Sequence, residues 1–328
     1  MSELKKLLSD LPGPDAASSM AVGIRASHVL RPTGAFMELD RVAAWLAGWQ
    51  GTDRPKVERP HAIVFAADHG VATEGVSAYP VDVTAAMVDA LRRGSATAAV
   101  LAREVGATIE VVDVGVGNPT GNLRVEPAMT PARFDEAVLA GVAAVDACDA
   151  DLLVFGEMGI GNTTSASALA AAVVGGTGTE WVGPGTGVAK EALLRKVHVV
   201  DDALERIGPV TPIEALREVG GAELAAIAGA VMAARRRGLP VVLDGFIVTA
   251  AVAPLAAAQP GALRHCIAGH CSAEPGHRRL LEYLGLNPLL DLDLRLGEGS
   301  GALAAVPLVR MAAAAVIDVA TFEEWGLA

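Results

Sequence analysis

The feature that most constrains the fold is an alternation between short apolar runs and longer segments of helical periodicity, which begins near residue 61. Short apolar runs are typical of strands buried in a parallel sheet. The longer segments 84–105, 191–207 and 213–237 repeat apolar residues at helical spacing. The predicted strands are 61–67, 109–114, 152–155, 241–243, 265–268 and 289–292. This order predicts an α/β fold, with a doubly wound, mostly parallel sheet of about six strands and helices on both faces.

The composition limits the classes of partner and compartment. Hydrophobic residues make up 52% of the 328 residues but aromatic residues only 4%, so Ala, Val and Leu must build the core. The net charge of −12 argues against a nucleic acid or an anionic membrane as a partner. The 3 cysteines, and the lack of an apolar signal region or an uninterrupted apolar run, predict a reduced, cytoplasmic enzyme without a membrane span.

The two ends of the chain show helical patterns without a strand signal. Leu39, Val42, Leu46 and Trp49 recur at helical spacing, and the last stretch from 302 returns to helix. We therefore predict a small helical domain, made of residues 1–60 with 304–328, beside a core of residues 61–303.

The stretch GEMGIGNTT, residues 156–164, lies between the predicted strand 152–155 and a helical segment at 165–172. A strand, a glycine-rich turn and a helix N-terminus together present free N–H groups to an anion. The spacing fits neither a P-loop nor the dinucleotide fingerprint G-x-G-x-x-G. Tight strand–helix packing without a ligand is the alternative interpretation of the same glycines.

Glu298 is the most suggestive acid, because Gly297 and Gly299 on either side allow a ligand to come close. In a partly dry pocket its pKa should rise, which suits a general base. The alternative is that Glu298 only caps the helix that begins near Gly301. Lys196, on the helix behind the GPGTG loop at 183–187, could meet a phosphate.

A second class of enzyme is suggested by Asp68, His69 and Asp113, which follow the first two predicted strands. Such residues resemble the start of a metal-dependent phosphohydrolase site, with Asp244 and His270 as possible further ligands. The segment from His265 to His277 also resembles a zinc site by its number of His and Cys residues. A shared zinc there is disfavoured, since neighbouring side chains in a strand point to opposite faces.

Taken together, the loops closely resemble those of the nicotinate-nucleotide–dimethylbenzimidazole phosphoribosyltransferase family, over about residues 11–322. The motifs that carry the resemblance are AADHGVATEGVSAYP, VVDVGVGN, GEMGIGNTTSASAL, GPGTG, LDGFI, GHCSAEPGH and LDLDLRLGEGSGA. GEMGIGNTT and LRLGEGSGA are the most specific of them.

The resemblance implies a reaction in which a benzimidazole nitrogen attacks C1′ of nicotinate mononucleotide, nicotinate leaves, and α-ribazole 5′-phosphate forms with inversion. It implies no metal and no cofactor, a homodimer, and Glu298 as the general base. The implied nucleotide and phosphate contacts are Glu157, Gly159, Ile160, Gly161, Asn162, Gly185, Lys196 and Ser272. The implied pocket for the acceptor base contains Ser77, Tyr79, Ala86, Met87 and Leu296.

One departure bears on the acceptor. Family members commonly carry Gln where this chain appears to have Ala86, after the EGVSAYP loop. The loss of a polar contact enlarges the pocket, so the acceptor could be adenine, another benzimidazole or a phenol in place of 5,6-dimethylbenzimidazole. A nucleotide-binding sensor without chemistry is a third hypothesis, against which the intact Gly297–Glu298–Gly299 sequence argues.

Overall fold

The computed structural model describes residues 2–183, 185, 187 and 190–327, except for the side chain of Lys190. Its centre is a six-stranded sheet in which every neighbouring pair of strands is parallel, in the order β2-β1-β3-β4-β5-β6. The strands are β1 (Pro60–Ala67), β2 (Thr108–Gly115), β3 (Leu152–Met158), β4 (Val241–Leu243), β5 (Cys266–Cys271) and β6 (Pro288–Asp291). The predicted doubly wound α/β fold is therefore confirmed.

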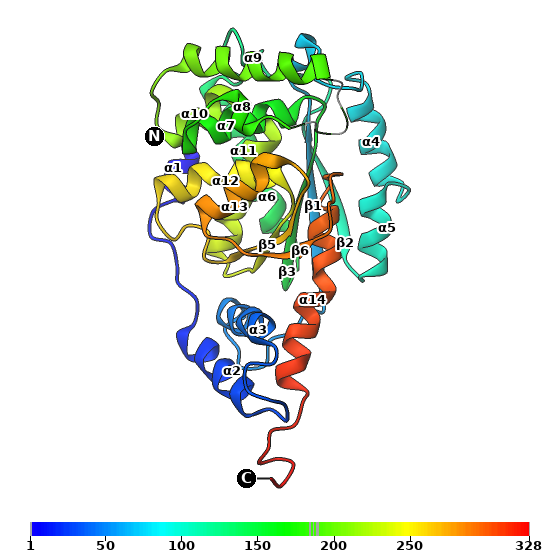
Figure 1. Ribbon diagram of the computed structural model, residues 1–328, viewed down its shortest axis with the longest axis vertical. Coiled ribbons are helices and arrows are strands. Elements are labelled where there is room, and N and C mark those ends of the chain that lie inside the picture. The colour runs from blue at the N-terminus through cyan, green and yellow to red at the C-terminus, as the bar shows by residue number, and fades with distance from the viewer. Residues whose placement is uncertain (1, 184, 186, 188–189, 328) are drawn as a thin grey trace.

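Helices cover both faces of this sheet (Figure 1). The helices are α1 (Glu3–Leu7), α2 (Ala16–His28), α3 (Met37–Gln50), the 3-10 helix η1 (Gly70–Glu74), α4 (Val83–Arg92), α5 (Thr97–Glu104), α6 (Pro131–Ala147), α7 (Asn162–Val174), α8 (Gly178–Trp181), α9 (Lys190–Ile207), α10 (Pro212–Val219), α11 (Ala222–Arg236), α12 (Phe246–Ala258), α13 (Pro275–Leu284) and α14 (Ser300–Ile317).

The alternation of side chains along each strand divides the core into two halves. Phe65 and Phe155 point into one cluster with α6, α7, α11 and α12. Val64 and Val154, one position earlier on the same strands, point into a second cluster with α3, α5 and α14. Because neighbouring residues on a strand face opposite sides, an unbroken apolar run such as 152–155 is what a sheet covered on both faces requires.

Two of the predicted helices are each broken in two by glycine. The predicted helix 84–105 is interrupted at Gly94, whose φ of 75° lies in the left-handed region, and this separates α4 from α5. The predicted helix 213–237 is interrupted at Gly220 and Gly221, between α10 and α11. Apolar spacing continued through both breaks, so periodicity alone did not show them.

The terminal helices do not all lie together. Helices α2 and α3 pack with α14 below the sheet in Figure 1, and Arg25 of α2 donates a hydrogen bond to the Val316 carbonyl (2.9 Å). Helix α1 lies elsewhere, because Leu4 belongs to the core cluster of α6 and α11. The predicted division into residues 61–303 and a terminal helical domain stays a prediction.

Helix α14 is long and apolar enough to cross a membrane by length and composition, but 56% of it is buried inside the protein. It packs against α3, α5 and β5, as a core helix does. A core helix passes the same test of length and composition, so α14 does not indicate a membrane span.

Candidate active site

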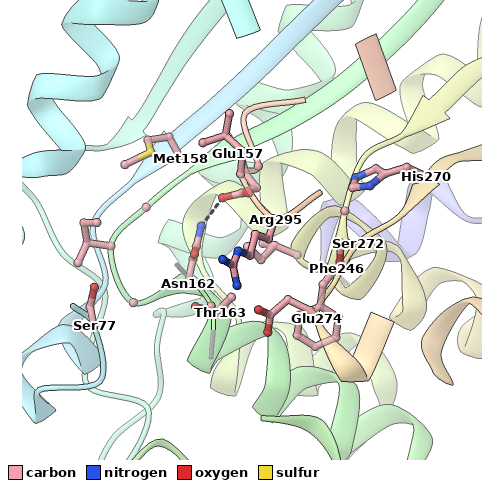
Figure 2. Close-up of a pocket in the computed structure, with 18 residues that line it drawn as sticks. Ser77, Glu157, Met158, Asn162, Thr163, Phe246, His270, Ser272, Glu274 and Arg295 are labelled. Carbon is pink, nitrogen blue, oxygen red and sulfur yellow. Dashed lines mark hydrogen bonds between the residues drawn. The ribbon is translucent and has the colours of Figure 1, made fainter. Parts of the chain in front are cut away.

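A cavity lies where the carboxyl ends of β3, β4 and β5 meet, as the topology of a doubly wound sheet predicts. Three stretches of chain line it, residues 157–163, 245–247 and 295–297. The remaining lining residues are Ser77, Gly185, His270, Ser272 and Glu274. Figure 2 shows these side chains, which come from segments up to 220 residues apart in the sequence numbering (77 to 297), around one open space.

The glycine-rich turn forms one wall of the cavity. Strand β3 continues through Met158, so the turn consists of Gly159, Ile160 and Gly161 and is shorter than the sequence suggested. Gly161 is the N-cap of α7 with a φ of 98°, which glycine adopts without strain. A Cβ at Gly159 would lie 2.6 Å from the Ala67 carbonyl oxygen, so only glycine fits there. The turn therefore leads into the N-terminus of α7 at the cavity wall, where the helix dipole favours negative charge, but a bound anion there stays a prediction.

Glu157 lies near the end of β3, and its side chain accepts a hydrogen bond from Asn162 (Figure 2). Burial raises the pKa of Glu157 well above its usual value, and the negative charges of Asp244 and Glu223 raise it further. Its other oxygen lies close to Gly297, where a Cβ would come within 2.5 Å of Oε1. Glu157 is thus a cavity-lining carboxyl group that takes up a proton more readily than an exposed glutamate.

Lys196 lies directly behind the loop that carries Gly185, and it is 1% exposed. Its Nζ donates a hydrogen bond to the Gly183 carbonyl (3.0 Å) and would lie 3.5 Å from a Cβ at Gly185. Burial lowers the pKa of Lys196 to about 8, against the opposing effect of the Glu274 carboxylate. Of the predicted loop 183–187, Pro184 and Thr186 lie outside the described residues.

Glu298 lies beside the cavity, one residue from Gly297, but its carboxylate is not part of the described lining. Its Oε2 accepts a hydrogen bond from the Ala98 N–H (3.4 Å), in the first turn of α5. Burial raises the pKa of Glu298, and the Asp244 charge adds to this against the effect of the Ala98 N–H. With a φ of 62°, Glu298 is also one of the few non-glycine residues of the described chain in the left-handed region, a strain that is often found at functional sites.

The interpretation of Glu298 as a helix cap is wrong, because Asp244 caps α14 instead. Asp244 accepts hydrogen bonds from the N–H groups of Gly299 (3.1 Å) and Ala302 (2.9 Å). Burial alone would raise the pKa of Asp244, but His270 and the N–H groups of Ala302 and Gly245 outweigh it and lower the pKa. The ionised Asp244 therefore fixes the loop that carries Glu298 to the end of β4.

The residues expected around the acceptor base are only partly brought together. Ser77 and Leu296 line the cavity. Tyr79 is 50% exposed, Ala86 is exposed on α4, and Met87 packs against the second core cluster. These last three are outside the described lining, so their role in an acceptor pocket stays a prediction.

Several lining residues were not among those predicted. Arg295 and Glu274 place a cation and an acid in the cavity, and Met158, Thr163 and Phe246 complete its walls. Burial raises the pKa of Glu274, and the Lys196 charge opposes this shift. Arg295 and Glu274 both belong to motifs that the sequence singled out, LRLGEGSGA and GHCSAEPGH, but no local pattern distinguished them from solvent-exposed charges.

The residues proposed for a phosphohydrolase each have a separate partner. Asp68 accepts from the Gly117 N–H (2.7 Å), His69 pairs with Glu223 (2.6 Å), and Asp113 accepts from the Val116 N–H (2.8 Å). Among the residues that the structure describes, no group of three or more His, Cys, Asp or Glu side chains is placed to hold a metal ion. This geometry gives the phosphohydrolase hypothesis no support.

Comparison with known proteins agrees with this geometry. A family model described as "Phosphoribosyltransferase" matches residues 11–327. A nicotinate-nucleotide–dimethylbenzimidazole phosphoribosyltransferase of Novosphingobium aromaticivorans is 47% identical, over 100% of this chain and 97% of its own length. The enzyme of the same name from Mesorhizobium japonicum is 48% identical, over 100% of this chain and 98% of its own length.

A solved structure agrees as well. The crystal structure of the enzyme of that name from Thermus thermophilus superimposes with a TM-score of 0.90 at 44% identity, over 96% of this chain and 99% of that chain. Sequence and fold thus match along nearly the whole length of the chain. The chain belongs to the nicotinate-nucleotide–dimethylbenzimidazole phosphoribosyltransferase family.

Proposed function

We propose that this enzyme transfers the 5-phosphoribosyl group of nicotinate mononucleotide to 5,6-dimethylbenzimidazole or a related base, with release of nicotinate and inversion at C1′. The relatives are named for this donor and this acceptor. The observation that carries the proposal is a cavity lined by a helix N-terminus and a buried acid. The N-terminus of α7 and Glu157 line it, Lys196 lies behind the lining residue Gly185, and Glu298 lies beside Gly297.

The two ends of the cavity suit the two substrates. The phosphate would lie at Gly159–Asn162 and Gly185, where the N-terminus of α7 and a buried lysine favour negative charge. The aromatic acceptor would lie toward Met158 and Leu296, which offer apolar surface, and toward Ser77. The anomeric carbon then falls between them, near Glu157.

Glu298 is our proposed general base for the N–H proton of the acceptor. Its raised pKa and its place beside Gly297 support this role, and its hydrogen bond to the Ala98 N–H keeps the carboxylate oriented. Glu157 is the competing candidate, since it lines the cavity and its pKa is raised more strongly.

We also propose a cytoplasmic homodimer.

The first experiment follows nicotinate release from nicotinate mononucleotide with a panel of acceptors, by mass spectrometry. Release that depends on 5,6-dimethylbenzimidazole, with α-ribazole 5′-phosphate as the product, is the expected result. Release only with adenine, another benzimidazole or a phenol would keep the transfer and assign the acceptor to the altered position Ala86. Failure with every acceptor would contradict the proposed function.

The second experiment compares Glu298→Gln with Glu157→Gln. If Glu298 is the base, Glu298→Gln lowers kcat by about 10²-fold or more, the usual contribution of a general base, with little change in donor binding. Glu157→Gln, which keeps a partner for Asn162, then costs less. The reverse order of effects would move the base role to Glu157. Circular dichroism and thermal unfolding of both variants control for folding.

A further inference from the structure

Ser272 lines the cavity, and its partner is a histidine that no part of the proposed mechanism uses. His277, in the first turn of α13, is fully buried. Its Nδ1 lies 2.9 Å from the Ser272 backbone nitrogen and 2.9 Å from the Ser272 Oγ. Its Nε2 lies 3.1 Å from the Thr249 Oγ1 on α12. A single ring therefore contacts both the main chain and the hydroxyl of one cavity residue.

These contacts determine where the protons lie. A backbone N–H can only donate, so Nδ1 of His277 accepts from Ser272 and carries no proton. The proton of the neutral ring is then on Nε2, which donates to Thr249. Burial lowers the pKa of His277 to about 3, so the ring keeps this neutral form at physiological pH.

The Ser272 hydroxyl can only donate to His277, because the unprotonated Nδ1 has no hydrogen to offer, and its O–H then shares the single lone pair of Nδ1 with the Ser272 N–H. An unprotonated Nδ1 at 2.9 Å from Oγ would repel the oxygen lone pairs unless the O–H points toward the ring. With its proton directed away from the cavity, Ser272 offers only lone pairs to whatever occupies the cavity. Ser272 is thus a hydrogen-bond acceptor, although a serine can in general play either part.

We propose that Ser272 accepts a hydrogen bond from a ribose hydroxyl of the donor substrate, and that His277 is the positioning residue that imposes this direction. The assignment rests on the proposed function, because it takes a ribosyl phosphate as the occupant. The phosphate oxygens of that substrate accept hydrogen bonds, whereas its 2′ and 3′ hydroxyls can donate. Ser272 therefore selects the sugar and leaves the phosphate to the N–H groups of the glycine-rich turn and to Lys196.

The surroundings of His277 support a fixed orientation. Its ring centroid lies 6.5 Å from that of Phe246 and 5.9 Å from that of His270, both of which line the cavity. A Cβ at the neighbouring Gly276 would lie 2.9 Å from the Trp181 carbonyl oxygen, so α13 approaches this region closely. A ring held on several sides keeps the Ser272 hydroxyl in one direction before any substrate binds, which is a form of preorganisation.

The test measures preference for ribose over deoxyribose. Wild type, Ser272→Ala, His277→Leu and His277→Asn are compared by kcat/KM for nicotinate mononucleotide and its 2′-deoxy and 3′-deoxy analogues. In Ser272→Ala and His277→Leu, the ratio of kcat/KM for nicotinate mononucleotide to that for one of the analogues should fall about tenfold, because one hydrogen bond contributes about this much. His277→Asn should retain it, because its side-chain oxygen can take the place of Nδ1. A purely structural role would lower the rates for all substrates together and leave the ratio unchanged.

A matched control is Ser167→Ala, which removes a buried hydroxyl on α7 that donates to the Thr163 carbonyl (2.8 Å) and does not line the described cavity. Its ratio should equal that of the wild type. A wild-type ratio in Ser272→Ala, against both analogues, would overturn the proposal, and a wild-type ratio in His277→Leu alone would remove the role of His277.

Binding separates this inference from the proposed reaction. Calorimetric affinities for ribose 5-phosphate and its 2-deoxy and 3-deoxy analogues need no turnover. If the wild type releases no nicotinate, the proposed transfer reaction is wrong. The affinity ratios of the same variants still show whether Ser272 accepts a hydrogen bond from a ribose hydroxyl. Equal ratios for wild type and Ser272→Ala would reject the inference whatever the activity.

Discussion

At the scale of single residues, the site depends on charged groups that are buried almost completely. Lys196 is the clearest case, because it is 1% exposed and its amine lies against the loop around Gly185. Burial of a cation costs free energy, and this cost shows as a lowered pKa. An incoming phosphate would offset part of that cost, which is why we propose that Lys196 favours an anionic substrate over a neutral one.

The protonation of Lys196 should therefore be visible in the kinetics. Since its pKa is about 8, the amine is charged below that pH and neutral above it. We expect kcat/KM for nicotinate mononucleotide to fall as the pH rises through about 8, because this parameter reports the free enzyme. Lys196→Met should be less active and should lack this step, while the exposed Lys5→Met should behave as wild type. A wild-type profile that stays flat through this region would contradict the assignment.

At the scale of elements, the helices on one face are held close by glycines. Helices α6 and α11 pack together more extensively than the other helix pairs of the described chain. A Cβ at Gly141 of α6 would lie 1.9 Å from the Ala226 carbonyl oxygen, and a Cβ at Gly229 of α11 would lie 2.2 Å from that of Val138. Each backbone thus occupies the space that a side chain on the other helix would need.

Gly141→Ala should therefore destabilise the protein without altering the cavity. The added methyl group meets backbone, which cannot move aside as a flexible side chain can, so we expect a loss of about 1–3 kcal/mol in the free energy of unfolding. Urea denaturation measures this loss. Gly23→Ala is the control, because a Cβ there meets nothing within 4 Å. Equal stability of Gly141→Ala and wild type would show that the helices can separate at low cost.

At the scale of the whole molecule, the fold keeps two histidines neutral. His265 immediately precedes β5 with its Nε2 2.8 Å from the Val231 carbonyl, and His277 contacts Ser272. Burial lowers the pKa of both to about 3. In the unfolded chain they titrate near pH 6.5, so between these values the unfolded state binds more protons than the folded state.

The stability that these histidines contribute should be complete above pH about 6.5 and should decline as the pH falls toward about 3. His265→Gln, whose amide can still donate to Val231, should reduce this acid-dependent loss. We would measure the free energy of unfolding in urea at neutral and mildly acidic pH for both proteins. The comparison uses the difference in the free energy of unfolding between wild type and His265→Gln at each pH. Glu157 and Glu298, whose pKa values are raised, increase stability as the pH falls, but they do so in both proteins and cancel in this difference. Parallel pH profiles would contradict the role of His265.

The sequence by itself determined what depends on neighbouring residues. Apolar runs and helical spacing predicted all six strands, and the glycines of residues 156–161 predicted the tight turn between β3 and α7. The motifs identified the family, which the comparisons then confirmed. Boundaries were less well predicted: β3 and β5 run further than expected, and glycines divide two of the predicted helices.

Only the tertiary structure decided which distant side chains meet. Asp244 caps α14 from 55 residues away, and Glu298 reaches Ala98 across 200 residues, so the expected cap was assigned to the wrong acid. For the same reason, the sequence did not predict that Arg295 and Glu274 line the cavity. Periodicity and turn chemistry act over a few residues, whereas hydrogen-bond partners, burial and the resulting pKa shifts depend on how elements far apart in the chain pack together.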